Sequence, residues 1–149
     1  MDTEQYCTFY IDDLYLAVEA RRVHEVLRGQ EPTEVPLANP ALRGLINLRG
    51  HIVPVIDLRV RLGLPPPKDG APQINVLVRT PHGPVSMLVD RVGDVQELAN
   101  EHFSAVPETM QGPARALIRG AFKLEDRLLL SLDADHAVDV TATDADLAG

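Results

Sequence analysis

Hydrophobic and polar positions alternate with a period of two over most of this chain, which is typical of strands that bury one face. The first alternating run ends at Asp12-Asp13, a pair that favours a turn, and a second run follows directly. The pattern therefore predicts an N-terminal hairpin over residues 6–11 and 14–18. Further strands are predicted at residues 44–48, 52–56, 74–78, 85–89, 92–95, 118–124 and 128–132.

The stretch from residue 20 to residue 29 follows a helical period instead. Its apolar residues would share one helical face. They are Ala20, Val23, Val26 and Leu27. Gly29 then stands where a glycine commonly ends a helix. We therefore expect one short helix after the first hairpin.

The hairpin predicted at residues 44–56 is the most informative segment. Its strands meet at Arg49-Gly50, a pair suited to a tight turn. Asp57 is placed to cap a single helical turn, and Gly63 is placed to close it. This segment contains no catalytic constellation. An arginine and glycines fixed at a bend suit a surface that another protein binds.

The proline-rich stretch at residues 64–70 is the clearest linker, and it lies near the middle of the chain. Many short strands with turns between them favour an all-β fold of small barrels over a βαβ sheet. Each half is too small to bury much surface alone, so the two should pack together. We expect the 149 residues to form a single domain. Its first barrel would span about residues 12–66, and its second would combine residues 5–11 with residues 72–135. Loop-like connections are expected at 30–40 and 99–116, and a weakly ordered acidic tail at 136–149.

Charge is spread unevenly along the chain, whose formal net charge is −8. Residues 35–79 carry 6 bases and 2 acids, whereas the segments on either side are acidic. An acidic chain with 4% aromatic residues is a poor candidate for nucleic-acid binding, which needs a basic surface and stacking rings. The basic middle is suited to an acidic protein partner, although solvated arginines explain the same pattern.

The chain carries none of the sequence signals of export or membrane insertion. Its N-terminus is acidic and polar, and no apolar run approaches the roughly 20 residues of a membrane-spanning helix. Cys7 is the single cysteine, so an internal disulfide is excluded. We expect a cytoplasmic protein, with Cys7 as a small structural residue of a strand.

The chemistry of common enzyme classes is absent from the sequence. No two glycines lie closer than six residues, so neither a dinucleotide-binding fingerprint nor a P-loop occurs. The serines lack a nucleophile-elbow context, and the histidines are not spaced as metal ligands. His51 lies just beyond the turn and is interpreted as a surface residue. We therefore expect no catalytic residues, no metal and no cofactor.

The hairpin segment closely resembles the signature of the CheW family of chemotaxis coupling proteins. The family pattern places apolar residues around Gly–x–x–Asn–Leu–Arg–Gly, followed by an apolar strand with an internal proline and then Asp–Leu–Arg. Residues 44–50, 52–56 and 57–59 match this pattern without a gap. Shorter matches occur at 23–27, 89–95 and 124–130, so the resemblance covers about residues 5–135.

The resemblance implies two packed five-stranded SH3-like barrels with no cofactor and no catalytic activity. It implies two partners: the cytoplasmic signalling tip of a chemoreceptor and the regulatory domain of a histidine kinase. Contact with the membrane would be indirect, through receptors, and the protein would be recruited to receptor arrays. The positions that match receptor-binding residues are Val23, Gly44, Asn47, Arg49 and Gly50. The candidates for kinase binding, on the second barrel, are Leu77, Val85, Met87, Val89 and Val95, of which strand alternation should bury about half.

Three features of the second half depart from the family pattern. The C-terminal amphipathic helix lacks its paired leucines and retains only Val138 as a strong apolar anchor, Ser86 replaces a common glycine, and the 99–116 connection is compact. An alternative is therefore an accessory adaptor that binds the receptor but binds the kinase weakly or not at all. A third hypothesis, a small-molecule or oligonucleotide binder built on small barrels, is disfavoured by the low aromatic content and the acidic balance.

Overall fold

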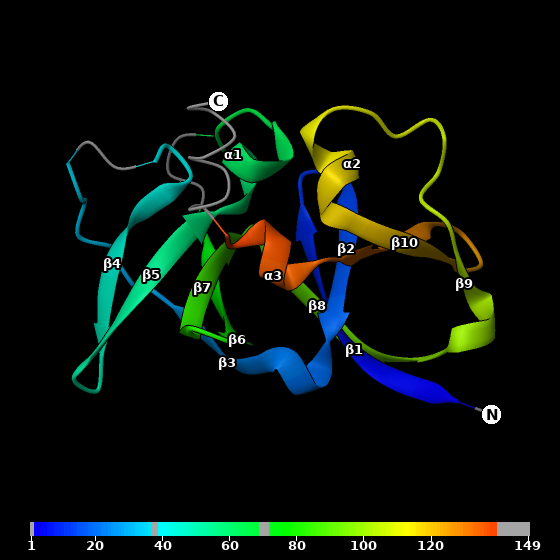
Figure 1. Ribbon diagram of the computed structural model, residues 1–149, viewed down its shortest axis with the longest axis horizontal. Coiled ribbons are helices and arrows are strands. Elements are labelled where there is room, and N and C mark those ends of the chain that lie inside the picture. Colours follow the sequence, from blue (N-terminus) through cyan, green and yellow to red (C-terminus); the bar gives the residue numbers. More distant parts are fainter. Residues whose placement is uncertain (1, 37–38, 69–71, 140–149) are drawn as a thin grey trace.

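The chain folds into two curled β-sheets, which the computed structural model describes over residues 2–36, 39–68 and 72–139 (Figure 1). The strands of the six-stranded sheet are, in spatial order, β8 (Arg91–Ala99), β1 (Thr3–Ile11), β2 (Leu14–Glu19), β11 (Leu128–Leu132), β10 (Ile118–Lys123) and β9 (Phe103–Ser104). The strands of the five-stranded sheet are β3 (Val23–Arg28), β6 (Ile74–Thr80), β7 (Gly83–Val89), β5 (His51–Asp57) and β4 (Leu42–Leu48). The all-β prediction is confirmed.

The sheets divide the chain differently from the expected barrel boundaries of 12–66 and of 5–11 with 72–135. Strand β2 stays with β1 because the two pair antiparallel along the whole length of β2, from Tyr6 opposite Glu19 to Ile11 opposite Leu14. Strands β6 and β7 join β3 and β5, so the second half of the chain completes the sheet that the first half begins. The proline-rich linker follows α1 and leads to β6, which belongs to the same five-stranded sheet as β5 before it. Residues 69–70 of that predicted linker lie outside the described residues.

The helix predicted over residues 20–29 is wrong in extent. Only the single turn η1 (Ala20–Arg22) is helical, and β3 follows it immediately. Along β3 the residues alternate between half-buried and exposed, and the strand pairs with β6 from Val23 opposite Val78 to Arg28 opposite Ile74. The same apolar residues fit a helical or an alternating period, and the pairing with β6 decides in favour of a strand.

The helical turn predicted after the signature hairpin is confirmed as α1 (Leu58–Leu62). The Asp57 carboxylate accepts a hydrogen bond from the backbone N–H of Arg59 at 3.0 Å, and Gly63 ends the helix with φ 74°. This cap and this glycine are the local signals that place the helix.

The 99–116 connection holds more regular structure than its predicted loop. It contains η2 (Asn100–His102) and β9, and α2 (Pro113–Leu117) begins within it. The first residue of α2 is Pro113, where a proline suits the start of a helix, and Leu117 is buried.

The C-terminal tail was expected to be weakly ordered from residue 136, and this is wrong for residues 136–139. Helix α3 (Ala134–Ala137) lies between the two sheets in Figure 1, and the carboxylate of Asp133 caps it. Ala134, Ala137 and Val138 are buried in the main apolar cluster, because small side chains let this helix approach closely. Residues 140–149 lie outside the described residues.

The main apolar cluster joins the two sheets. Phe9 and Leu16 of the six-stranded sheet share it with Ile56 and Met87 of the five-stranded sheet, all at most 1% exposed. A main cluster that spans both sheets agrees with the expectation that neither half buries enough surface alone.

An ionic cluster centred on the buried Arg59 also connects the sheets. Arg59 of α1, which is 5% exposed, donates to Asp12 in the β1–β2 turn at 2.5 Å and to Asp90, between β7 and β8, at 2.6 and 3.2 Å. It also donates to the carbonyl oxygen of Pro65 at 2.6 Å. The hydrogen bonds to Asp90, followed by the one to Asp12, raise the pKa of the Arg59 guanidinium, so this side chain keeps its positive charge.

Candidate functional site

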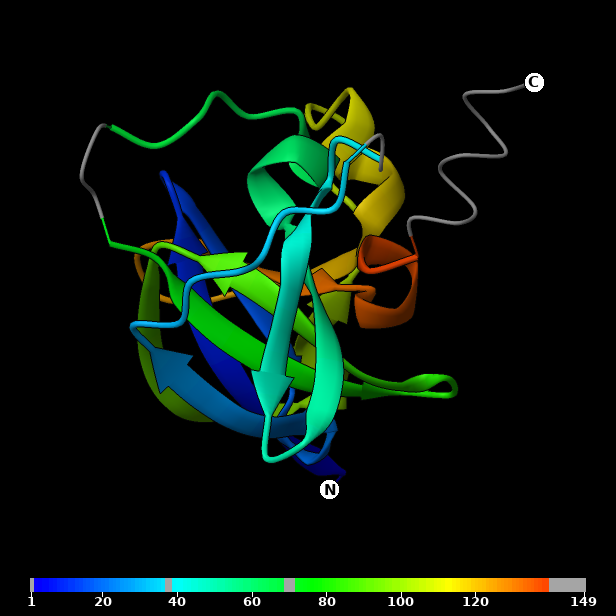
Figure 2. The same ribbon diagram turned by 90° about the vertical axis from the view of Figure 1, so that its left-hand side faces the viewer.

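The β4–β5 turn forms the centre of the candidate site and projects at one end of the five-stranded sheet (Figure 2). Its two central residues, Arg49 and Gly50, both have positive φ, at 51° and 86°. This is the backbone of a two-residue turn whose twist matches the flanking strands. The side-chain oxygen of Asn47 accepts a hydrogen bond from the N–H of Gly50 at 3.0 Å, so the turn is held from within.

The guanidinium of Arg49 makes a two-point ion pair with Glu25 of β3. The Nη1–Oε1 distance is 2.8 Å and the Nη2–Oε2 distance is 3.1 Å. The hydrogen bond from Arg49 holds the pKa of the Glu25 carboxyl below its ordinary value, with a smaller contribution from His24, whose Nε2 lies 3.8 Å away. The Arg49 side chain remains 71% exposed, so the pair orients the guanidinium without hiding it.

This ion pair closes the five-stranded sheet on itself. Strands β3 and β4 are its two edges, and Arg49 follows β4 directly. A second link reaches β4 from the segment that follows β3, where Thr33 and Leu45 exchange backbone hydrogen bonds of 2.8 and 2.9 Å. The turn is therefore held in place by contacts that join the two ends of the sheet.

An exposed apolar residue adjoins the turn. Ile52 lies directly opposite Asn47 in the hairpin and is 60% exposed. We define the turn surface as Glu25, Asn47, Arg49, Gly50 and Ile52. It combines a fixed guanidinium with an apolar side chain, which is a combination that protein interfaces use.

Sequence reasoning missed Glu25 and Ile52 as members of this site. Glu25 lies in the segment assigned to a helix, and its partner Arg49 is 24 residues away. Ile52 belongs to an apolar strand in which alternation alone does not tell the exposed face from the buried one.

Gly44 was expected to allow a partner to approach the backbone, and the structure gives it a different role. It is buried, and a Cβ at this position would overlap the carbonyl group of Thr33. Its φ of 152° and the register shift between Leu42 and Gly44 also need a residue without a side chain. Gly44 therefore allows the chain's own 30–36 segment to pack against β4.

Val23 also lies in the barrel wall and not at the turn. It is half-buried, pairs with Val78 and packs against the main apolar cluster. Of the five residues predicted for receptor binding, the structure brings Asn47, Arg49 and Gly50 together at one exposed turn.

The residues predicted for kinase binding do not form one surface. Leu77, Met87 and Val89 are at most 2% exposed, so a partner cannot reach them in the folded protein. Val85 is half-buried in the same sheet, whereas Val95 is 58% exposed on β8, an edge of the other sheet. Only Val95 is a freely accessible apolar candidate.

The described residues hold no cluster that suggests a metal site: over 2–36, 39–68 and 72–139, no three His, Cys, Asp or Glu side chains gather around one point. Within the same ranges, no helix has the length and apolar character needed to cross a membrane. Burial raises the pKa of the Cys7 thiol, which is the direction for a structural and not a reactive cysteine.

Comparison with known proteins gives a consistent result. The family model of the CheW-like domain matches residues 5–141. "Chemotaxis protein CheW" of Bacillus subtilis (strain 168) is 32% identical over 136 residues, which cover 91% of this chain and 87% of that protein. "Probable chemotaxis protein CheW" of Rhizobium etli is 30% identical over 138 residues, 92% of this chain and 88% of that protein. The crystal structure of scaffolding protein TtCheW from Thermoanaerobacter tengcongensis superimposes with a TM-score of 0.83 at 22% identity, covering 93% of this chain and 94% of that one.

Proposed function

The chain belongs to the family of CheW-like domains, which are non-catalytic chemotaxis adaptors, and on that basis we propose that it joins the cytoplasmic tip of a chemoreceptor to the regulatory domain of a histidine kinase. In this proposal the protein is recruited to receptor arrays and contacts the membrane only through receptors.

The observation that carries the receptor part of the proposal is the pre-oriented Arg49. A guanidinium presents its donors in one plane, and the pair with Glu25 restricts its rotation before any partner arrives. Less conformational entropy is then lost on binding. A receptor tip made of paired helices offers carboxylates and apolar side chains, which are the groups that Arg49 and the exposed Ile52 can contact.

The kinase part of the proposal uses exposed apolar residues on an edge strand of the six-stranded sheet. Val95 and Val92 of β8 are 58% and 36% exposed, and this strand is an edge. They replace the buried Leu77, Met87 and Val89 as the residues to test.

The accessory-adaptor alternative rested on departures in the second half of the chain, and two of them are accommodated structurally. Helix α3 forms and packs into the main cluster in spite of its small side chains. Ser86 is fully buried and donates a hydrogen bond to the Asn75 side-chain oxygen at 2.7 Å, so its hydroxyl has a partner. These features weaken the reason to expect a lost kinase interface.

The deciding experiment is a parallel titration of the purified protein against a soluble receptor-tip fragment and the kinase regulatory domain. Binding to both partners, with a ternary complex in size-exclusion chromatography, is the expected result. Binding to the receptor tip alone would favour the accessory adaptor, and binding to neither would reject the proposal. The Arg28→Glu variant is the charge control for Arg49→Glu, because Arg28 is an exposed arginine at the end of β3 and is not one of the turn-surface residues.

A further inference from the structure

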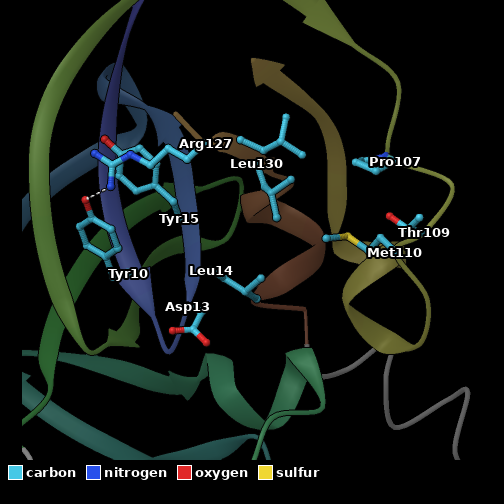
Figure 3. Close-up of a pocket in the computed structure, with 10 residues that line it drawn as sticks. Tyr10, Asp13, Leu14, Tyr15, Pro107, Thr109, Met110, Arg127 and Leu130 are labelled. Carbon is cyan, nitrogen blue, oxygen red and sulfur yellow. Dashed lines mark hydrogen bonds between the residues drawn. The ribbon is translucent and has the colours of Figure 1, made fainter. Parts of the chain in front are cut away.

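A cleft of about 400 Å³ opens on the six-stranded sheet (Figure 3), and none of the residues that line it belongs to the turn surface. It lies between the β1–β2 hairpin, the β10–β11 hairpin and the segment that precedes α2. Pockets that hold small molecules typically have volumes of roughly 300–1,000 Å³. The cleft is therefore large enough for a ligand of about ten non-hydrogen atoms.

Two facing walls of the cleft are apolar. Leu14 and Leu130 line one side, and Pro107 and Met110 line the other (Figure 3). Leu128 also lines it and is 40% exposed. An apolar body such as an alkyl chain or a phenyl ring would be desolvated between these walls.

The wall formed by residues 107–110 is held in place without a ligand. Arg115 donates to the carbonyl oxygens of Pro107 and Met110 at 2.8 and 3.0 Å. The N–H of Met110 also donates to Pro107 at 3.0 Å, which makes a tight turn. A preformed wall lowers the ordering cost of binding.

One end of the cleft presents a fixed cation. The guanidinium of Arg127 stacks over the Tyr15 ring at 4.0 Å, and its Nη1 donates to the Tyr10 hydroxyl at 2.8 Å. The two tyrosine rings stack on each other at 4.7 Å, and Arg91 lies 4.3 Å from the Tyr10 ring centre. Arg91 is not among the residues that line the cleft, so this end carries one guanidinium, that of Arg127, on a rigid aromatic support.

Arg127 keeps hydrogen-bonding capacity for a ligand. Among the described residues its guanidinium makes one hydrogen bond, to Tyr10, and its Nε lies 3.9 Å from the Asp126 carboxylate, which is too far for another. A guanidinium has five N–H donors in its plane, so N–H groups along its edge remain for a carboxylate.

The other charged group lining the cleft is Asp13. Figure 3 places it beside Leu14, apart from Arg127. A ligand with a second negative charge would be repelled by Asp13, whereas a single carboxylate at the Arg127 end would not contact it.

We propose that this cleft binds a small amphipathic monocarboxylate, with its carboxylate on Arg127 and its apolar body between Leu14 and Met110. The proposal goes beyond the adaptor function and does not depend on it. The ligand would occupy a site on the adaptor that is separate from the turn surface.

The test is an NMR titration of the ¹⁵N-labelled full chain. The probes are octanoate and 3-phenylpropionate, each paired with its amide, which has the same body without the charge. Suberate, which has a second carboxylate, tests the role of Asp13. The variants are Arg127→Gln, Arg127→Lys and Leu128→Asn, and the matched control is Arg28→Gln, an exposed arginine of the other sheet.

We expect saturable shifts at residues 13–15, 107–110 and 127–130 with both monocarboxylates. Binding should weaken about ten-fold or more for the amides and for Arg127→Gln, since each removes a charge-assisted hydrogen bond. Arg127→Lys should weaken binding less, Leu128→Asn should weaken it without changing the preference for the charged probe, and Arg28→Gln should leave it unchanged.

Three results would overturn the proposal. The first is equal binding of acids and amides, which would leave no role for the guanidinium. The second is a set of shifts that lies outside the cleft. The third is a set of shifts at these residues with the kinase regulatory domain but with neither carboxylate, which would make the cleft part of a protein interface.

Discussion

The guanidinium of Arg49 contacts the carboxylate of Glu25 at two points, with Nη1–Oε1 at 2.8 Å and Nη2–Oε2 at 3.1 Å. One residue belongs to the β4–β5 turn and the other to β3, so a single ion pair joins the two edges of the five-stranded sheet. The same contact fixes the direction of the Arg49 guanidinium, which is the cation of the turn surface. Its role in stability and its role in recognition can be separated by mutation.

Arg49→Glu should raise the Kd for the receptor tip about ten-fold or more, while the circular dichroism spectrum stays that of the wild type. The substitution replaces the guanidinium, which donates hydrogen bonds, with a carboxylate that the neighbouring Glu25 carboxylate repels. Isothermal titration calorimetry measures the affinity. The double variant Glu25→Arg, Arg49→Glu restores an ion pair but not the guanidinium at the turn, so it should remain defective. A receptor affinity equal to wild type in either variant would show that Arg49 is not part of the receptor site.

The pKa of Glu25 should lie below its ordinary value of 4.5 in the folded protein. Because the folded-state value is lowered, the contribution of the pair to stability is present above pH 4.5 and is lost as the pH falls through the folded pKa. A carboxyl-detected NMR titration measures this directly. In Arg49→Gln the pKa should return toward 4.5, and an unchanged value would contradict the cause assigned here.

Gly44→Ala should destabilise the fold by about 2 kcal/mol or more, because the added methyl group overlaps Thr33 and the backbone has φ 152°. Gly50→Ala is the matched control. Its φ is also positive, at 86°, but no atom lies within 4 Å of the added methyl, so only about 1–2 kcal/mol of backbone strain is expected. Urea unfolding of both variants compares them, and equal losses would rule out the steric role of Thr33.

Arg59→Met should lower the free energy of unfolding by about 2 kcal/mol, since it leaves Asp90 and Asp12 without their buried cation. Both carboxylates are partly exposed, which keeps the loss below that of a fully buried pair. The triple variant Arg59→Met, Asp90→Leu, Asp12→Asn removes the charges together and should recover part of the stability. Denaturant unfolding decides between them. A single variant as stable as wild type would show that the cluster contributes nothing.

Met87→Ala and Val95→Ser should differ sharply in stability. Met87 is fully buried, so its truncation should cost about 2–5 kcal/mol, whereas Val95 is 58% exposed and its change should stay within about 0.5 kcal/mol. Thermal unfolding measures both. In the kinase-binding titration, Val95→Ser is then the interpretable variant, and a strong effect on stability would remove Val95 from the exposed set.

The elements with local signals could be predicted from sequence. The β1–β2 hairpin follows from Asp12-Asp13 between two alternating runs, and α1 follows from the Asp57 cap and Gly63. The helix prediction for residues 20–29 was wrong because their apolar spacing suits either a helix or a strand, and only the pairing with β6 makes the strand favourable. The prediction of weak order was wrong for residues 136–139 because the alanines of this segment show no amphipathic signal. Their small size is nevertheless what lets α3 pack between the sheets.

By itself the sequence determined the turns, the caps, the all-β class and the family, because each depends on residues that are close together along the chain. Only the tertiary structure decided which face of each strand is buried, as at Leu77, Met87 and Val89. It also decided that Gly44 leaves room for the backbone carbonyl of Thr33 and that Arg49 pairs with Glu25. These contacts join residues that are distant in sequence, and they exist only once the sheets curl and pack, since alternation alone is equally satisfied with either face turned inward.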